Sequence, residues 1–272
     1  MCCHDSEQNA TGDRKSRWPV SSPCAMASAT IIQSALCRTT AKFRPSPSLF
    51  FFPGLRQQPV YDADELQRTS SGSWACFQWL QALKAGHEQI KGEYLRLQAA
   101  QVPSDYLVGE QEHQLHEGEW QWHSFMQKGV INKFFDMYCP ATAAFLMGLQ
   151  KDQQLMRSIP LSYAFFSTLK GGAKIAAHSA PANLRLRVHY PLIVPDGAGV
   201  ADCGMRIGEQ QLQWTEGQPL VFDDSFEHEV WNKTEQDRVV LLFDIWHPEI
   251  TLPERAAIRE MFAHAREQGW LK

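Results

Sequence analysis

The sequence predicts a mainly β fold with flanking helices, closed as a double-stranded β-helix, or jelly roll. Three observations predict it. Beyond residue 160, short apolar runs are separated by turn signals such as Pro195-Asp-Gly197 and Glu216-Gly217. Before that point the patterns are mostly helical. Hydrophobic residues make up 44% of the 272 residues, and the nine tryptophans add enough apolar surface for one sizeable core. Short strands at such intervals favour a closed or two-sheet architecture.

Helical periodicity dominates residues 62–102. Trp79, Leu80 and Leu83 recur at helical spacing, and charged residues lie between the apolar positions. Ser70 to Ser73 offers hydroxyl groups that can cap one helix start. We therefore expect helices here.

A strand and a further helix follow. Residues 118–127 alternate as a strand does, although Phe125 breaks the alternation. Residues 131–149 are typical of a helix. Pro140 interrupts it, because proline lacks an N–H donor and disfavours helix at the residue before it.

The remaining sequence is strand-like up to a terminal helix. The candidate strands are 161–169, 183–194, 203–208, 211–214, 219–222, 226–231 and 238–246. Pro248 ends the last of them, and Pro253 begins a helix with an acidic residue in its first turn.

The strand 183–194 has two chemically different faces. Because side chains alternate across a strand, Arg185, Arg187 and His189 share one face and the intervening apolar residues share the other. Three basic groups held together repel one another unless an anion lies between them. The pattern therefore indicates a carboxylate or phosphate ligand inside the β structure. The alternative is an exposed face with scattered arginines.

Two histidines and an arginine extend this pattern. His178 precedes the basic strand, His228 lies in a later strand, and Arg238 opens the strand after that. Neutral imidazoles suit iron, zinc or copper. Two histidines on separate strands followed by an arginine are the layout of non-haem iron oxygenases. In those enzymes a 2-oxo acid chelates the metal and an arginine pairs with its far carboxylate.

Longer blocks make the pattern specific. They are His178-Ser-Ala-Pro-Ala-Asn-Leu-Arg-Leu-Arg-Val-His189, Trp214-Thr-Glu-Gly217, Phe222-Asp-Asp-Ser-Phe-Glu-His-Glu-Val-Trp231 and Asp244-Ile-Trp-His-Pro-Glu249. With these blocks, residues 163–250 closely resemble the aspartyl/asparaginyl β-hydroxylase family of iron(II)- and 2-oxoglutarate-dependent oxygenases. Phe52-Pro-Gly-Leu55 resembles the start of the family's domain, which extends the resemblance to about residues 49–263.

The resemblance implies a metal site with two protein ligands. His178 and His228 fall on the family's metal-binding histidines. Most related oxygenases carry Asp or Glu two residues after the first histidine, but this chain has Ala180 there, as its family does. Of Asp223 and Asp224, we expect Asp224 to orient metal-bound water; the alternative is that both form a solvated turn.

The resemblance also implies a cosubstrate site. Arg187 and His189 fall on residues that contact 2-oxoglutarate near the metal. Arg238 falls on the arginine that pairs with its distal carboxylate, and Ser167 on the hydroxyl that assists this arginine. The implied cofactors are iron(II), 2-oxoglutarate as cosubstrate, and O₂.

The implied reaction is hydroxylation of an unactivated C–H bond. The first expectation for the substrate is the β-carbon of Asp or Asn in a protein or peptide. The alternatives are a lipid acyl chain, a small amino-acid derivative, or no catalysis at all in a cupin-like module that binds an anion or metal.

Charge and hydropathy restrict the partners. The net charge of −4 argues against general nucleic-acid binding, which needs a basic surface. No apolar run approaches the length of a transmembrane helix, so we expect no stable membrane insertion. Of seven cysteines only Cys76, Cys139 and Cys203 fall in the predicted domain, which indicates free thiols rather than a disulfide framework. Nothing in the sequence predicts an oligomeric state.

The first 48 residues differ from the rest. No Asp or Glu occurs from Arg14 to Tyr61, and the segment is rich in hydroxyl and basic residues, as transit peptides are. A disordered tail or a misplaced translation start are the alternatives. We therefore expect an extension over residues 1–48 and one oxygenase domain over 49–272, in a cytoplasmic or organellar compartment. That domain would hold a helical part at about 62–150 and a jelly-roll core at about 160–250.

Overall fold

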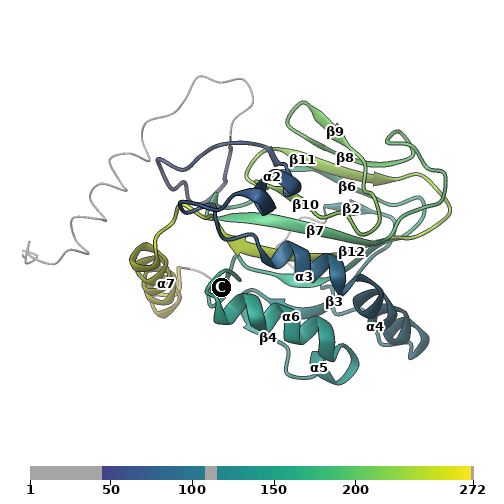
Figure 1. Cartoon of the computed structure of the whole chain (residues 1–272), viewed down its shortest axis with the longest axis horizontal. Coiled ribbons are helices and arrows are strands. Elements are labelled where there is room, and N and C mark those ends of the chain that lie inside the picture. Colours follow the sequence, from purple (N-terminus) through teal and green to yellow (C-terminus); the bar gives the residue numbers. More distant parts are fainter. Residues whose placement is uncertain (1–44, 108–114, 271–272) are drawn as a thin grey trace, which may run out of the picture.

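A computed structural model of the chain describes residues 45–107 and 115–270 (Figure 1). The prediction of a targeting or disordered extension over residues 1–48 concerns a segment that lies almost wholly outside these residues.

Two antiparallel sheets face each other. The seven-stranded sheet has the order β1-β10-β7-β12-β5-β3-β4, and the five-stranded sheet has the order β2-β6-β11-β8-β9. The strands of the larger sheet are β1 (Val60–Tyr61), β10 (Leu220–Phe222), β7 (Arg185–Ile193), β12 (Arg238–Trp246), β5 (Ala164–Leu169), β3 (Trp120–Gln127) and β4 (Val130–Ile131). Those of the smaller sheet are β2 (His116–Glu117), β6 (Lys174–His178), β11 (His228–Asn232), β8 (Cys203–Ile207) and β9 (Gln210–Leu212). The predicted jelly roll is confirmed.

Helices cover the outer face of the larger sheet, and α7 (Leu252–Glu267) lies apart from the others (Figure 1). The other helices are α2 (Ala63–Arg68), α3 (Trp79–Ala85), α4 (His87–Ala99), α5 (Phe135–Tyr138) and α6 (Pro140–Lys151). Pro140 begins α6 instead of interrupting a longer helix, since proline is tolerated in a first turn. Thr251 and Glu254 form a reciprocal capping box at the start of α7. None of the helices described in the structure is long and apolar enough to cross a bilayer.

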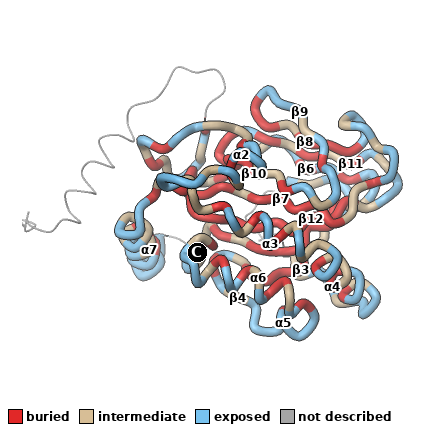
Figure 2. The backbone as a smooth tube through the Cα atoms, in the orientation of Figure 1, coloured by how far each residue is buried: buried red, intermediate tan, exposed pale blue. Residues whose placement is uncertain are grey.

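The central strand β12 separates two hydrophobic layers. Val239, Leu241 and Phe243 pack with the helices, whereas Val240 and Leu242 pack between the sheets. All nine residues of β12 are buried, as Figure 2 shows for the middle of the fold. This two-sided burial leaves the inner face of the larger sheet as the wall of an enclosed interior.

Residues 62–102 form three helices, as expected, because the chain leaves the helical conformation between α2 and α3 and turns at Gly86. One local expectation is wrong. Ser70 to Ser73 caps none of them: Gln78 is the N-cap residue of α3, while Asp62 caps α2 through the N–H groups of Asp64 and Glu65.

The broken alternation at Phe125 is explained by a bulge in β3. Trp122 lies opposite Ser167, but the register with β5 shifts between Ser124 and Met126. The extra residue sends Phe125 and Met126 into the same helix-facing core. The tryptophans before the bulge thereby stay on the inner face.

The strand β6 was not predicted, although it ends at His178. Its residues Lys174–His178 are mostly exposed or half-buried and lack an apolar run. Pairing with β11 on one side and β2 on the other holds it in the smaller sheet.

Candidate active site

The two predicted metal ligands lie opposite each other. His178 at the end of β6 and His228 at the start of β11 are direct partners in the ladder, and their ring centroids are 4.2 Å apart. The Nδ1 atom of His178 lies 2.8 Å from the carbonyl oxygen of Ala176, and that of His228 lies 2.9 Å from the carbonyl oxygen of Phe226. A carbonyl oxygen only accepts, so each Nδ1 carries the proton and donates. Each Nε2 therefore keeps its lone pair.

Both imidazoles are held neutral. Burial lowers the pKa of His228 to about 3, assisted by the neighbouring His178. Burial also lowers the pKa of His178. Neutral imidazoles with a hydrogen-bonded far nitrogen are the form in which histidine binds first-row transition metals.

No third ligand accompanies them in the described part of the chain, where no group of three or more His, Cys, Asp or Glu residues could hold a metal ion. Ala180 lines the same cavity as His178 and His228. The donor set thus fits a metal that takes its remaining ligands from small molecules.

A cavity of about 310 Å³ opens beside the histidines. Its wall contains His178, His228, Ala180, Arg185, Arg187 and Asp224. The lining also includes a set of aromatic and apolar residues: Tyr106, Leu115, Trp120, Trp122, Tyr163, Phe165 and Leu242. The rings pack on one another: Trp122 stacks on Phe165 at 4.0 Å and lies 4.6 Å from Tyr106.

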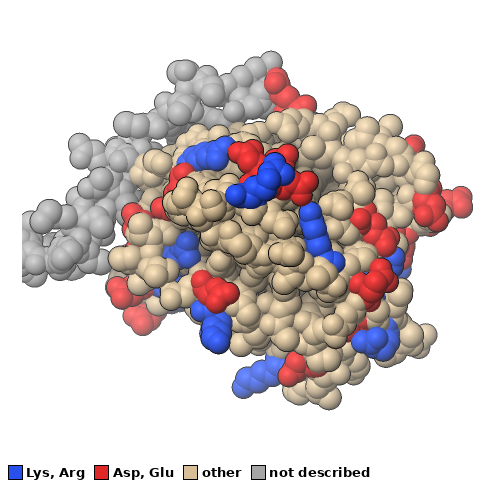
Figure 3. All heavy atoms as spheres, in the orientation of Figure 1, with Lys and Arg blue, Asp and Glu red and all other residues tan. Residues whose placement is uncertain are grey.

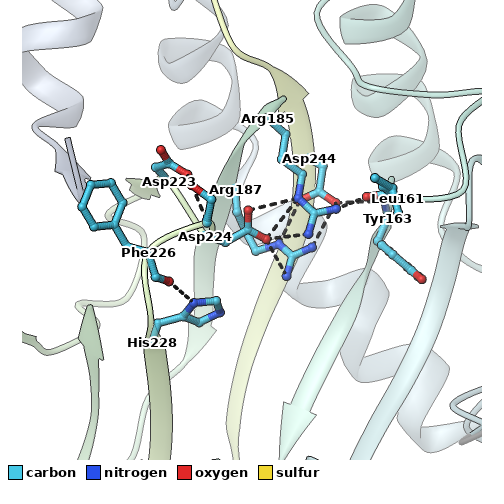
Figure 4. Close-up of polar contacts among 10 residues, drawn as sticks. Leu161, Tyr163, Arg185, Arg187, Asp223, Asp224, Phe226, His228 and Asp244 are labelled. Atoms are coloured by element: carbon cyan, nitrogen blue, oxygen red, sulfur yellow. Dashed lines mark hydrogen bonds and ion pairs between the residues drawn. The ribbon is translucent and has the colours of Figure 1, made fainter. Parts of the chain in front are cut away.

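Four charged side chains, three of them buried and Arg187 half-buried, form a closed network next to the cavity (Figure 4). Arg187 donates from Nε and Nη2 to Asp244 at 2.8 and 3.0 Å, and its Nη1 lies 3.2 Å from Asp224. Arg185 donates from Nη2 to Asp224 at 2.6 Å and approaches Asp244 at 3.1 Å. The protein itself therefore supplies the anions that these two arginines require. The expectation that a ligand neutralises the basic strand is wrong for this pair.

The two aspartates before His228 are buried, not part of a solvated turn. Asp224 accepts hydrogen bonds from Arg185 and forms an ion pair with Arg187. Burial alone would raise its pKa, but the charges of Arg185 and Arg187 outweigh burial and hold the pKa well below its ordinary value. Asp223 faces Ser225, and burial raises the pKa of Asp223 to about 7. The pKa values of two adjacent carboxyl groups are thus shifted in opposite directions, because only Asp224 pairs directly with arginines.

Arg238 differs from Arg185 and Arg187, which both pair with carboxylates. Its side chain is buried, and within residues 45–107 and 115–270 no carboxylate pairs with it. Its Nε has no hydrogen-bond partner there, and its Nη1 is 3.5 Å from the Ser167 hydroxyl, which also accepts from the indole of Trp120. The Trp214 ring lies 4.7 Å from the guanidinium carbon. Burial lowers the pKa of Arg238 to about 10. A buried cation without a counter-charge is a receptor for an anion.

His189 lies on the same inner face of β7. Its ring is buried and accepts a hydrogen bond at Nδ1 from the indole N–H of Trp214, at 3.3 Å. Burial, together with the charges of Arg238 and Arg187, keeps its pKa well below the ordinary value. His189 is therefore neutral.

The structure thus places His178 and His228 on the smaller sheet, and Ser167, Arg187, His189 and Arg238 on the facing larger sheet. Sequence reasoning missed Asp244 and the part played by Trp214. The available signal for Asp244 was an acidic residue at an inward position of an otherwise apolar strand. Trp214 belonged to a quoted motif, but its contacts are non-local.

The surface lacks a dominant charge. Figure 3 shows acidic and basic side chains interspersed over one face of the molecule. A basic stripe of the kind that binds nucleic acid is not seen on the described residues of that face.

The chain matches a known family model. Residues 84–248 match the model described as aspartyl/asparaginyl beta-hydroxylase. This match spans more than half of the chain and contains every residue of the interior described above.

Several curated proteins are similar. The mouse aspartyl/asparaginyl beta-hydroxylase is 28% identical over 211 residues, which are 78% of this chain but 26% of that protein. The mouse aspartate beta-hydroxylase domain-containing protein 2 is 28% identical over 223 residues, 81% of this chain and 60% of that protein. The ornithine lipid ester-linked acyl 2-hydroxylase of Rhizobium tropici is 29% identical over 198 residues, 71% of this chain and 62% of that protein. The chain thus spans about a quarter of the first relative and under two thirds of the others.

Solved structures resemble the fold more distantly. A prolyl hydroxylase from Trichoplax adhaerens, in complex with a peptide of hypoxia inducible factor, has a TM-score of 0.42 and 12% identity over 63% of this chain and 81% of its own. A prolyl-4-hydroxylase from Pseudomonas putida has a TM-score of 0.36 and 16% identity over 68% of this chain and 96% of its own.

Proposed function

The chain belongs to the aspartyl/asparaginyl β-hydroxylase family, and from this premise we propose that it is an iron(II)- and 2-oxoglutarate-dependent hydroxylase of an unactivated C–H bond. The observation that carries the proposal is the buried, uncompensated guanidinium of Arg238 in the same interior as two neutral histidines with free Nε2 atoms. A dicarboxylate that chelates a metal at one end needs an arrangement of this kind.

His178 and His228 would hold iron(II) through their Nε2 atoms. Two oxygens of 2-oxoglutarate and water would complete the coordination, since Ala180 offers no ligand. Bound iron(II) would supply the chemistry that activates O₂. One oxygen atom converts 2-oxoglutarate into succinate and CO₂, and the other converts the substrate C–H into C–OH. The protein's own contribution is to orient the reactants and keep water out.

Arg238 would receive the distal carboxylate of 2-oxoglutarate, assisted by the Ser167 hydroxyl. Both groups are buried, and burial strengthens their attraction for an anion. Arg187 and His189 would contact the cosubstrate nearer the metal. Arg187 donates two N–H groups to Asp244, and its Nη1 forms an ion pair with Asp224. An arginine has five, so it keeps donors for this task.

Asp224 would orient water at the metal. It lines the cavity together with both histidines, and its pairing with Arg185 and Arg187 keeps it ionised as an acceptor. The same arginines restrict its rotation, which a positioning role requires.

For the substrate, we propose the β-carbon of an Asp or Asn side chain in a protein or peptide. Relatives named aspartyl/asparaginyl beta-hydroxylase support this choice. The donors that remain free on Arg187, at the cavity wall, offer contacts for a carboxylate or amide.

A second candidate is the acyl chain of a lipid. The aromatic and apolar side of the cavity, formed by residues such as Trp122, Tyr163 and Phe165, suits a hydrocarbon, and the nearby charges are compensated internally. The similar Rhizobium protein is named for acyl 2-hydroxylation.

The test uses the full chain with iron(II), 2-oxoglutarate and O₂. One set of reactions contains peptides with a single Asp or Asn, and the other a long-chain N-acyl amide. A mass gain of one oxygen, in step with succinate formation, identifies the substrate class. Anaerobic addition of iron(II) and 2-oxoglutarate should produce a weak visible charge-transfer band. A non-catalytic, anion-binding module would bind 2-oxoglutarate equally well without iron(II), and that result would overturn the proposal.

A further inference from the structure

Three histidines of the interior differ in what their Nδ1 atoms contact: a hydrogen-bond acceptor for two of them and a donor for the third. Behind His178 and His228 lie carbonyl oxygens, which only accept. Behind His189 lies the indole N–H of Trp214, which only donates. A neutral imidazole has one N–H and one lone pair, so its neighbour at Nδ1 decides what its Nε2 can do.

We propose that Trp214 is a positioning residue, which holds His189 in the Nε2–H tautomer and makes it a hydrogen-bond donor to the carboxylate or keto oxygen of the cosubstrate. The identity of this ligand rests on the proposed function; the tautomer does not.

The geometry of the indole supports this role. The indole nitrogen of Trp214 lies 3.3 Å from Nδ1 of His189, and the two ring planes are inclined by 31°. His189 is buried between the positive charges of Arg238 and Arg187, and both oppose its protonation. With Nδ1 occupied as an acceptor, the single proton of the neutral ring belongs on Nε2.

The three histidines therefore differ in what their Nε2 atoms can bind. His178 and His228 present lone pairs at Nε2 and can bind a metal. His189 presents an N–H at Nε2 and cannot be a third ligand through that atom. An N–H donor instead suits the oxygen of an anion.

Trp214 also covers the other end of the anion site. Its ring face lies 4.7 Å from the guanidinium carbon of Arg238 while its edge donates to His189, so one side chain positions both groups. The following turn is anchored, because Gly217 donates its N–H to the carbonyl of Pro191 and Glu216 meets Lys91 and His87 of α4. The indole is thereby tied to the helical layer.

The tautomers can be read directly by ¹⁵N NMR of the histidine rings in the metal-free full chain. His189 signals are assigned by their loss in H189Q. We expect Nε2–H for His189 and Nδ1–H for His178 and His228. Wild-type protein with His189 in the Nδ1–H form would overturn the inference, whatever becomes of any variant.

W214F keeps the ring but removes the N–H donor. We expect His189 to lose its single tautomer and the Kd for 2-oxoglutarate, measured with iron(II) under anaerobic conditions, to rise roughly tenfold. The matched control is W231F, which also removes one indole hydrogen bond, to the carbonyl of Val200, and should change neither quantity. An unchanged His189 tautomer in W214F would contradict the assignment.

Two further variants test the two ring nitrogen atoms of His189 separately. The amide nitrogen of glutamine in H189Q occupies about the place of Nε2, whereas that of asparagine in H189N occupies about the place of Nδ1. H189Q should therefore keep 2-oxoglutarate affinity within a few-fold, and H189N should lose it; the reverse order would refute the donor role. Wild-type protein with the expected tautomers but no affinity for 2-oxoglutarate would support the tautomer assignment and overturn the proposed function.

Discussion

Arg187 and Asp244 form a two-pronged ion pair between neighbouring strands, with Nε–Oδ1 and Nη2–Oδ2 distances of 2.8 and 3.0 Å. The two residues are direct partners in the β7–β12 ladder, and the carboxylate is fully buried. Asp224 and Arg185 complete the network, so an inward face that would otherwise repel itself is neutral.

Removing one anion from this network should destabilise the fold strongly. D244A leaves the buried guanidinium of Arg185 and the half-buried one of Arg187 short of a partner, and we expect it to lower the free energy of unfolding by about 3–5 kcal/mol. Urea denaturation measures this. The control is E117A, which breaks the exposed Lys174–Glu117 pair and should change stability by less than about 1 kcal/mol. Equal effects of the two variants would show that the network does not stabilise the fold.

Loss of one imidazole should abolish metal-dependent turnover. In H228A a single protein ligand remains, and we expect no iron-dependent succinate formation and a loss of iron(II) affinity of at least about 100-fold. Both are measured on the same preparation, by succinate assay and metal titration. H264A, on the exposed side of α7, should match the wild type. Full activity in H228A would refute the metal site.

Arg238 should matter for cosubstrate affinity and not for stability. R238M removes the distal anion contact, so we expect the apparent KM for 2-oxoglutarate to rise about 100-fold while turnover at saturating cosubstrate falls much less. Because an uncompensated buried charge is costly, the ligand-free variant should unfold at the same or a higher urea concentration than the wild type. An equal loss of maximal rate at saturation, or a marked loss of stability, would count against the assigned role.

Asp223 should make stability fall with rising pH. Burial raises its folded-state pKa from 3.8 to about 7. A raised pKa means that the folded state binds the proton more tightly, so this contribution is complete below about pH 4 and is lost as the pH rises through 7. D223N stays neutral and keeps the oxygen that accepts from Ser225.

The free energy of unfolding of D223N relative to wild type should therefore increase between pH 5 and pH 8, on the order of 1–3 kcal/mol. Denaturation at several pH values checks this. D136N, on the exposed side of α5, should follow the wild type throughout. A flat difference across this range would mean that Asp223 titrates normally in the folded protein.

The sequence by itself determined which residues of each long strand face inward. Alternation is a local property with a period of two, so the shared face of Arg185, Arg187 and His189 could be read without knowing their neighbours. Strand positions from 164 to 246 were predicted within a few residues for the same reason. The exception, β6, has no apolar alternation and exists because β11 pairs with it.

Only the tertiary structure decided what those inward residues meet. The partner of Arg187, the indole behind His189 and the absence of a carboxylate near Arg238 among the described residues depend on the register of strands far apart in the chain. A shift of one residue in that register would turn every side chain to the other face, and no local pattern records it. Motifs therefore identified the chemical groups, whereas charge state, tautomer and pairing followed from packing, because burial and neighbouring charges set them.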